Sequence, residues 1–378
     1  MRFLIAPDSF KGSLTAKQVA TTIKRAIEDV WPAASTVLMP MADGGEGTVE
    51  AIVDAIDGQY ISTQVTGPLG TKATATWGII AEQQPTAIIE VANICGLTMV
   101  PLEERNPLHT TSYGVGEIIL AAFDQGIRSF IIGLGGSATN DGGIGMLTAL
   151  GVQFYDNNNN LLPGFGRDLA HIAKVDYRHL DTRLQHCHFI AATDVQNTLL
   201  GSQGATTIFA PQKGATPAVV QMMELQMNNY ANLVEQHLGQ PYKQLPGSGA
   251  AGGIAFALLT IGATISAGAN VVAETMKLDE QFPLVDWVIT GEGLSDEQTL
   301  YGKLPIYIAT KAKQHHKKCL LISGSLGNNT EALSEHFAAC FATISRPVDL
   351  ITCLQEAEHN LWQTTKQIIQ LIKNVHAE

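Results

Sequence analysis

The stretch Phe3–Thr15 reads FLIAPDSFKGSLT, and it decides the fold at the very start of the chain. A short apolar run, Phe3–Ala6, passes into a loop that carries Asp8 and Lys11. Apolar residues then recur at helical spacing over residues 15–30, which predicts a helix. A buried strand, a polar loop and a helix in this order form the repeating unit of a parallel α/β sheet.

The same rhythm recurs along the chain. A strand over 36–41 leads into the loop DGGEG at 43–47 and a helix over 48–56. It returns near the end, with strands predicted over 287–290, 320–323 and 341–344, and helices over 305–313 and 360–375. The middle is richer in strand-like runs, over 73–80, 86–91, 129–132 and 189–192. We therefore expect an α/β protein of two domains, one from residues 1–60 plus 280–378 and an inserted α/β domain from 61–279.

Composition limits the choice of partners. The formal net charge of −12 argues against nucleic acid, whose phosphates need a basic face. It leaves a small anionic substrate open, because a local pocket can be positive in an acidic protein. The five scattered cysteines are typical of reduced thiols, and no run approaches the roughly 18 apolar residues of a membrane span. We expect a cytoplasmic protein, a monomer or homodimer without nucleic acid or membrane partners.

Loops rich in glycine and carboxylates follow several predicted strands. They contain Asp8, Asp43, the run 133–143, Asp194 and Glu292. In open parallel sheets, ligands bind beyond the carboxyl ends of the strands, where glycines let backbone N–H groups approach phosphate. Carboxylates shared with substrate phosphates suit Mg²⁺, and lysines can neutralise charge on a transferred phosphoryl group. These loops predict a phosphotransferase site.

We assign roles within this site as hypotheses. Asp8 or Asp194 accepts the proton of the attacking hydroxyl, and Lys11 assists catalysis. Asp43 and Asp141 are the predicted Mg²⁺ ligands. Substrate binding is assigned to Ser9, Arg105, Glu292 and Lys303. ATP phosphates are expected along Gly133, Gly135, Gly136 and Ser137, and along Gly249, Gly252 and Gly253.

The two glycine runs also have structural explanations that involve no ligand. The run at 133–138 fits G-x-G-x-x-A after a strand, and it could equally be a tight turn. The run at 247–252 fits G-x-G-x-x-G but follows Pro246 rather than a strand, so it could serve close helix packing. The motifs of P-loop enzymes and of protein kinases are absent from the sequence.

Seven blocks taken together resemble the class I bacterial glycerate kinases. They are APDSFKGSLT at 6–15, PMADGGEGT at 40–48, EERNP at 103–107, TSYGVGE at 111–117, GLGGSATNDGG at 133–143, FAPQKGA at 209–215 and PGSGAAGG at 246–253. The resemblance implies a flavodoxin-like domain from both chain ends and an inserted restriction-enzyme-like domain. It also implies ATP, Mg²⁺ and D-glycerate, with 2-phosphoglycerate as product. Leu294 stands where the family usually carries arginine.

Other functions stay open at this point. A nicotinamide-dependent hydroxy-acid dehydrogenase would use the run 133–138, with Asp156 as the acidic residue for the ribose. A non-catalytic protein that binds a small acid would not need so many carboxylate-bearing loops. A kinase that makes 3-phosphoglycerate is the third alternative.

Overall fold

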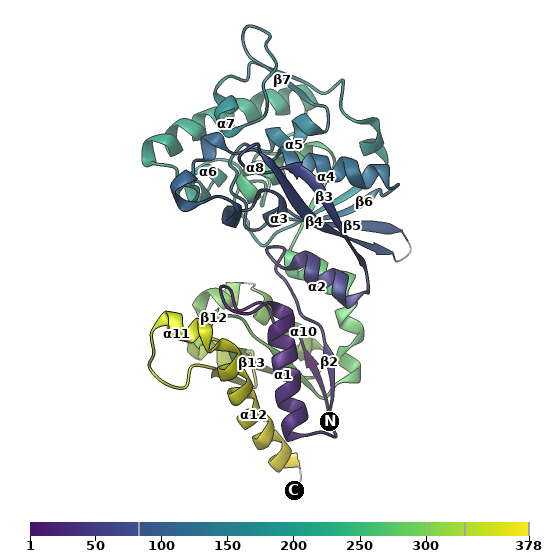
Figure 1. The fold of residues 1–378 in the computed structure, drawn as a ribbon, viewed down its shortest axis with the longest axis vertical. Coiled ribbons are helices and arrows are strands. Elements are labelled where there is room, and N and C mark those ends of the chain that lie inside the picture. The colour runs from purple at the N-terminus through teal and green to yellow at the C-terminus, as the bar shows by residue number, and fades with distance from the viewer. Residues whose placement is uncertain (82–83, 302, 329, 377–378) are drawn as a thin grey trace. The chain divides into compact units, whose positions relative to one another are not determined.

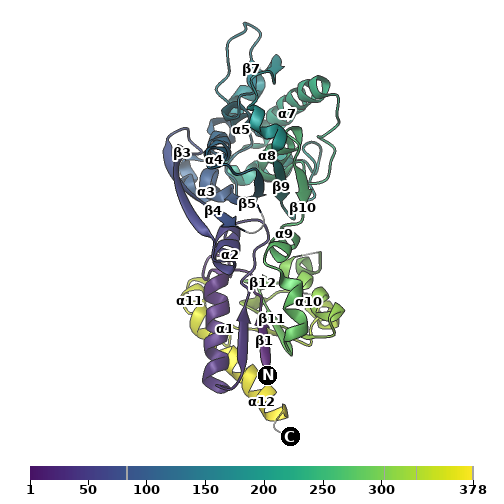
Figure 2. The ribbon, with the colours of Figure 1, turned by 90° about the vertical axis from the view of Figure 1, so that its right-hand side faces the viewer.

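A computed structural model describes residues 1–81, 84–301, 303–328 and 330–376. The chain forms two compact units, drawn in Figures 1 and 2. Unit 1 consists of Met1–Asp43, Glu50–Ile56 and Ala269–Glu378, and unit 2 of Gly44–Val49 and Asp57–Gly268. Within the described residues, no helix combines the length and the apolar character that crossing a membrane requires.

The core of unit 1 is a five-stranded, all-parallel sheet. Its order is β15–β13–β11–β1–β2. The strands are β1 (Arg2–Ile5), β2 (Ser35–Leu38), β11 (Trp287–Thr290), β13 (Lys318–Ser323) and β15 (Ala339–Ala342). Counted along the chain, this is the order 2-1-3-4-5 of flavodoxin-like sheets. The strand order reverses direction between β1 and β11, and ligands of such sheets bind beside that switch point.

Helices cover both faces of this sheet. Figure 1 shows α1 (Ala16–Val30) beside α12 (Ala357–His376), and Figure 2 shows α10 (Leu304–Gln314) on the other side of β1 and β11 from α1. Thr15 begins α1 with a capping box to Gln18, which satisfies orphan N–H groups of the first turn. The apolar face of α1 packs with α12 and the sheet around Phe3, Ile5 and Ile289. The shorter helices are α2 (Thr48–Ala55), α9 (Gly268–Thr275) and α11 (Leu350–Gln355).

Unit 2 contains a six-stranded mixed sheet in the order β10–β9–β6–β5–β4–β3. Its strands are β3 (Gln59–Thr66), β4 (Lys72–Ala81), β5 (Pro85–Glu90), β6 (Ser129–Gly133), β9 (His188–Ala192) and β10 (Thr264–Ser266). The first three are antiparallel, and β5 to β10 pair in parallel. The helices are α3 (Ala92–Cys95), α4 (Tyr113–Asp124), α5 (Ile144–Ala149), α6 (Ala205–Phe209), α7 (Pro217–Leu238) and α8 (Ala250–Thr260).

Two small strand pairs and a set of aromatic side chains complete the structure. β7 (Gln153–Tyr155) and β8 (Lys174–Asp176) form a separate antiparallel pair in unit 2. β12 (Leu294–Ser295) and β14 (Ser325–Leu326) form a parallel pair in unit 1. Fully buried aromatic side chains fill the core of unit 2, among them Trp77, Phe130, Phe154, Tyr230 and Phe256.

The predicted α/β class is confirmed, and most predicted elements lie within a few residues of their predicted bounds. One predicted strand is displaced. The strand predicted over 341–344 is β15, which begins at Ala339, because the apolar run alone does not show which residues reach the sheet. In α8, which begins at Ala250, residues Ala251, Gly252 and Gly253 have left-handed backbone angles that mark a kink.

Candidate active site

Three predicted carboxylates follow three adjacent strands of unit 1. Asp8 comes after β1, Asp43 after β2 and Glu292 after β11. The backbone N–H of Asp8 donates to the carbonyl of Gly291 at 2.9 Å, which joins the two loops on either side of the switch point. Parallel strands deliver their carboxyl ends to one edge of the sheet, so these loops meet there.

Lys11 and Asp43 form an ion pair at this edge. The distance from Nζ of Lys11 to Oδ2 of Asp43 is 3.1 Å. The Lys11 side chain is 73% exposed, so the ammonium is open to an incoming group. Burial opposes the charged form of Lys11, but the carboxylates of Asp43 and Asp8 outweigh it and raise its pKa. The lysine therefore stays charged at neutral pH.

Asp8 interacts electrostatically with both members of this pair and is 7% exposed. Burial, together with the negative charge of Asp43, raises the pKa of Asp8 to about 7. The backbone N–H of Ser9 donates to Oδ1 of Asp8 at 2.6 Å and holds the carboxyl group in place. A positioned carboxylate with a pKa near neutrality has the property that a general base needs.

Glu292 is held by hydroxyl groups that the sequence prediction did not include. Oε1 of Glu292 accepts hydrogen bonds from Ser295 at 2.9 Å and Thr299 at 2.7 Å. Nζ of Lys303 lies 3.5 Å from Oε2. The spacing of Ser295 and Thr299 after Glu292 is visible in the sequence, but only the folded loop shows that they orient this carboxylate.

The donor set of unit 1 fits Mg²⁺. Asp43 and Glu292 both raise the pKa of Asp8, which means that three carboxylates share one region of negative potential. Among the described residues, no three such side chains converge into a ready-made metal cage. Mg²⁺ in kinases is bound through one or two carboxylates plus substrate phosphates, so such a cage is not required.

Two of the glycines predicted to bind ATP phosphates lie in close contact with another backbone segment of unit 2. The segment 44–45 lies on the loop that follows β6: a Cβ at Gly135 would stand 2.4 Å from Cα of Gly45, and one at Gly133 2.7 Å from the carbonyl of Gly44. The N–H of Gly135 donates to that same carbonyl at 3.2 Å. Close backbone packing explains both glycines, and the Gly135 N–H is engaged before any phosphate arrives.

Replacing Gly135 with alanine is therefore expected to destabilise the protein by about 3 kcal/mol, because the new methyl group meets backbone that cannot rotate away. Gly239 is the control: it has a φ of +70° and nothing within 4 Å of an added Cβ, so alanine there should cost only about 1 kcal/mol. Urea unfolding measures both. Equal losses for the two variants would contradict the packing explanation.

The second glycine run packs against the first. A Cβ at Gly252 would lie 2.0 Å from the carbonyl of Thr139, and the N–H of Gly142 donates to the carbonyl of Gly252 at 2.9 Å. A Cβ at Gly253 would lie 2.7 Å from Cα of Gly142, and one at Gly249 2.3 Å from the carbonyl of Thr198. The structure thus favours the close-packing explanation for 249–253. Gly136 has a φ of +72°, and its carbonyl accepts from the N–H of Leu97.

Asp141 anchors these loops. It is fully buried and accepts from the N–H and the hydroxyl of Ser112, both at 2.8 Å, and from the N–H groups of Gly143 and Gly145. Burial raises its pKa. A carboxylate surrounded by four donors has little capacity left for a cation, so this geometry favours a structural role over the predicted metal ligand.

Asp194 and Arg105 also belong to unit 2. Oδ1 of Asp194 accepts from the N–H of Gly268 at 2.9 Å, at the start of α9, where a negative charge is favourable. The guanidinium of Arg105 donates to the carbonyls of Val100 and Leu97, both at 3.4 Å. The structure brings together Asp8, Ser9, Lys11, Asp43, Glu292 and Lys303 in unit 1, whereas Asp194 and Arg105 belong to unit 2.

Two buried ionisable side chains were missed as site candidates. Lys213 is 3% exposed, and its Nζ donates to Oγ of Ser137 at 3.0 Å and to the carbonyl of Thr139 at 2.6 Å. Burial lowers its pKa to about 8. Glu90, at the end of β5, accepts from the N–H groups of Gly47 and Val49, and burial raises its pKa to about 7. The sequence signal for Lys213 is its place in the block at 209–215 that resembles the family, and the signal for Glu90 is a charged residue within the apolar run at 86–91.

The dehydrogenase alternative fails on topology. Its ribose residue must end the strand next to the glycine-bearing strand in the same parallel sheet. Asp156 instead follows β7, which pairs with β8 in a two-stranded sheet apart from the six-stranded sheet. Its carboxylate accepts from the N–H groups of Asn158 and Asn160, which is an ordinary turn.

The fold and the acidic, lysine-bearing switch point define an α/β phosphotransferase. The model of the glycerate kinase family matches residues 3–373. A glycerate kinase of Haemophilus influenzae is 45% identical over 98% of this chain and 99% of that protein, and a glycerate 2-kinase of Escherichia coli is 42% identical over 97% of each. The crystal structure of a protein described as glycerate kinase 2 from Salmonella typhimurium LT2 superposes with a TM-score of 0.86 at 40% identity, covering 100% and 99% of the two chains.

This chain belongs to the glycerate kinase family. Its membership confirms the resemblance of the seven sequence blocks and the predicted phosphotransferase class. It also implies ATP as the phosphate donor and a small molecule as the acceptor.

Proposed function

We propose that this protein transfers the γ-phosphoryl group of ATP to D-glycerate and releases 2-phosphoglycerate and ADP. Family membership supports the reaction class, and the similar Escherichia coli protein carries the name glycerate 2-kinase. The observation that carries the proposal is the convergence of Asp8, Lys11, Asp43 and Glu292 at the switch point of unit 1. This combination of a base, a cation and two further carboxylates is what phosphoryl transfer requires.

The proposed chemistry divides among these side chains. Asp8 accepts the proton of the attacking hydroxyl, because its pKa of about 7 lets it be ionised yet basic. Lys11 neutralises charge that develops on the transferred group, and its exposed ammonium can reach that group. Ser9 and Lys303 are proposed to bind the substrate, with Glu292 setting the position of Lys303 through their ion pair.

Mg²⁺ is the proposed metal. Asp43 would hold it, together with phosphate oxygens of ATP, and it would neutralise the phosphates. The Lys11 ammonium lies 3.1 Å from Oδ2 of Asp43, so Mg²⁺ would share this carboxylate with the lysine. In unit 2, Gly136 and Ser137 stay proposed for the ATP phosphates, since Lys213 brings a buried positive charge to Ser137.

Several finer predictions belong with this proposal. We propose that the two compact units are the two expected domains, with the inner boundary near residue 269 instead of 280. D-glycerate is the proposed acceptor, with a cytoplasmic location, a monomer or homodimer, and no nucleic acid partner. Four further residues predicted for the site receive no catalytic role in this proposal. Their contacts within unit 2 are described above, and the residues are Asp194, Arg105, Gly249 and Asp141.

The test is ADP release from MgATP with and without D-glycerate, followed by phosphorus NMR of the product. We expect ADP only when D-glycerate is present, and a signal for the 2-phosphate. L-Glycerate is the matched control for chirality. A 3-phosphate signal would replace the proposed product by the alternative one, and no glycerate-dependent ADP would overturn the acceptor.

A further inference from the structure

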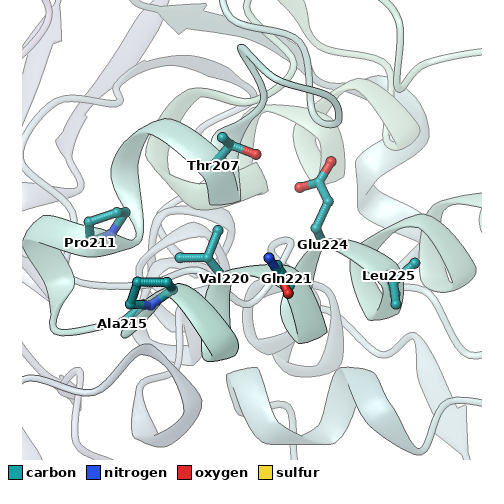
Figure 3. A pocket seen from close by; sticks show the side chains of 8 residues that line it. Thr207, Pro211, Ala215, Val220, Gln221, Glu224 and Leu225 are labelled. Atoms are coloured by element: carbon teal, nitrogen blue, oxygen red, sulfur yellow. The ribbon is translucent and has the colours of Figure 1, made fainter.

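A buried lysine of unit 2 has been given no role of its own so far. Lys213 lies in the turn after α6, between Pro211 and Ala215, whose side chains line the pocket that Figure 3 shows. Lys213 itself does not line this pocket, and it is 3% exposed. Its Nζ instead donates to Oγ of Ser137 at 3.0 Å and to the carbonyl of Thr139 at 2.6 Å, so both of these acceptors are uncharged.

The charge of Lys213 is costly where it lies. Burial lowers its pKa to about 8, and the charges of Cys95 and Asp141 offset this effect only in part. At neutral pH the side chain therefore remains mostly charged. A buried ammonium group held by neutral acceptors is unfavourable for the fold. Such groups are common at functional positions, because the charge of a substrate can compensate them.

The hydrogen bond from Lys213 decides what the Ser137 hydroxyl can do. An ammonium group can only donate, so Oγ of Ser137 must be the acceptor in this bond. The hydroxyl hydrogen of Ser137 therefore points away from Lys213 and can be donated to another group. Within the ranges that the structure describes, no atom accepts it. Lys213 thus holds the Ser137 hydroxyl as a hydrogen-bond donor.

Two backbone donors belong to the same turn. The N–H groups of Gly136 and Ser137 have no acceptor among the described residues, whereas the N–H groups on either side donate to carbonyls at 3.2 and 2.8 Å. Gly136 is exposed and has a φ of +72°. Successive N–H groups in a turn of this kind form a concave site for an anion. Together with the hydroxyl, this turn offers three donors to one ligand.

The segment that carries Lys213 is fixed to the rest of unit 2. A Cβ at Gly214 would lie 1.9 Å from the carbonyl of Arg105, so the turn packs directly against another backbone segment. In α6, the hydroxyl of Thr206 accepts from the amide of Asn140 at 3.0 Å. The lysine is therefore in place before a substrate arrives, which reduces the cost of ordering the site on binding.

We propose that Lys213 is a positioning residue, which holds the Ser137 hydroxyl and the N–H groups of Gly136 and Ser137 in place to bind an anionic oxygen of a substrate. The proposed occupant is a phosphate oxygen of ATP, and the carboxylate of D-glycerate offers the same chemistry. The inference rests on the proposed function, which supplies both anions. It adds a lysine that acts through Ser137 without contacting the substrate itself.

The first test removes the donor. Ser137→Ala is expected to raise the KM for ATP by about tenfold, with the KM for D-glycerate unchanged, because a hydrogen bond to a charged group is lost. Calorimetric titration with MgATP, without D-glycerate, should show the same loss of affinity. A rise confined to the KM for D-glycerate would identify its carboxylate as the anion. Unchanged KM values for both substrates would overturn the inference.

The matched control removes another buried hydroxyl of unit 2. Thr260 of α8 donates to the carbonyl of Ala257 at 2.7 Å and accepts from the hydroxyl of Tyr177 at 3.2 Å, so both functions of its hydroxyl are used inside the fold. Thr260→Val should lower the melting temperature and leave both KM values unchanged. Equal changes of KM in Thr260→Val and Ser137→Ala would show a general structural effect and overturn the inference.

The second test asks whether Lys213 acts through Ser137. Lys213→Met should raise the same KM by about tenfold in the wild type and change it little further in Ser137→Ala, because residues that act as a unit are not additive. Full, independent effects of the two substitutions, or an unchanged KM in folded Lys213→Met, would overturn the role of the lysine. If Lys213→Met does not fold, the Ser137→Ala result decides alone.

Failure of the proposed function has a different signature. The wild type would then form no ADP in response to D-glycerate. Calorimetric titration with MgATP does not depend on turnover, so it still compares the wild type with Ser137→Ala.

Discussion

Asp8→Asn is expected to lower kcat by about 10³-fold while the KM for ATP changes little, because it removes the proposed base and keeps the shape of the side chain. Asp8 is buried and its pKa is raised to about 7, so the wild-type rate should fall as the pH drops below about 7. The residual rate of Asp8→Asn should lose this acid limb. Steady-state kinetics between pH 5 and 9 measure both effects.

Stability provides the control for this variant. The pKa of Asp8 is raised from 3.8 to about 7 in the folded protein, so the folded state binds the proton more tightly than the unfolded state. The ionised carboxylate therefore destabilises the fold above pH 7, and this cost declines as the pH falls from 7 toward 3.8. Asp8→Asn should melt at a higher temperature than the wild type at pH 8, and the gap should close near pH 4. A variant that is both unfolded and inactive would contradict this prediction.

Lys11→Met should lower kcat by about 10²-fold or more with little loss of stability. The ammonium is 73% exposed and pairs with Asp43, so its removal costs the fold little, whereas the transferred phosphoryl group loses a neutralising charge. Turnover and thermal unfolding of the purified variant separate the two effects.

Lys17→Met is the matched control. Lys17 is also exposed and pairs with Asp54 at 2.7 Å in unit 1, but it follows the start of α1 and does not lie at the strand ends. It should keep full activity. Near-normal turnover in folded Lys11→Met, or an equal loss in both variants, would remove Lys11 from the mechanism.

The positions of the unit 1 carboxylates were predictable, because each follows a strand in the sequence and parallel strands end at the same edge of a sheet. A short apolar run followed by a loop and an amphipathic helix predicts a parallel sheet, and each carboxylate directly follows its strand. The sequence alone therefore places Asp8, Asp43 and Glu292 at one edge of the sheet. The hydroxyls of Ser295 and Thr299 could not be assigned, because their use depends on how the loop after Glu292 folds back.

Glycine motifs were less informative, because a glycine that approaches phosphate and a glycine that approaches another backbone look the same in a sequence. Backbone from segments far away along the chain leaves no room for a Cβ at three of these glycines. They are Gly133, Gly135 and Gly252. Only the folded chain shows which atoms fill the space beside each glycine.

The α/β class, the family resemblance and the carboxylates and lysine at the strand ends all follow from the amino-acid sequence, since these depend on periodicity and on local order. The raised pKa of Asp8 and the burial of Lys213 follow only from the tertiary structure. Each of these depends on burial and on neighbours that are distant in sequence, because desolvation and close contact are set by the packing of the whole unit.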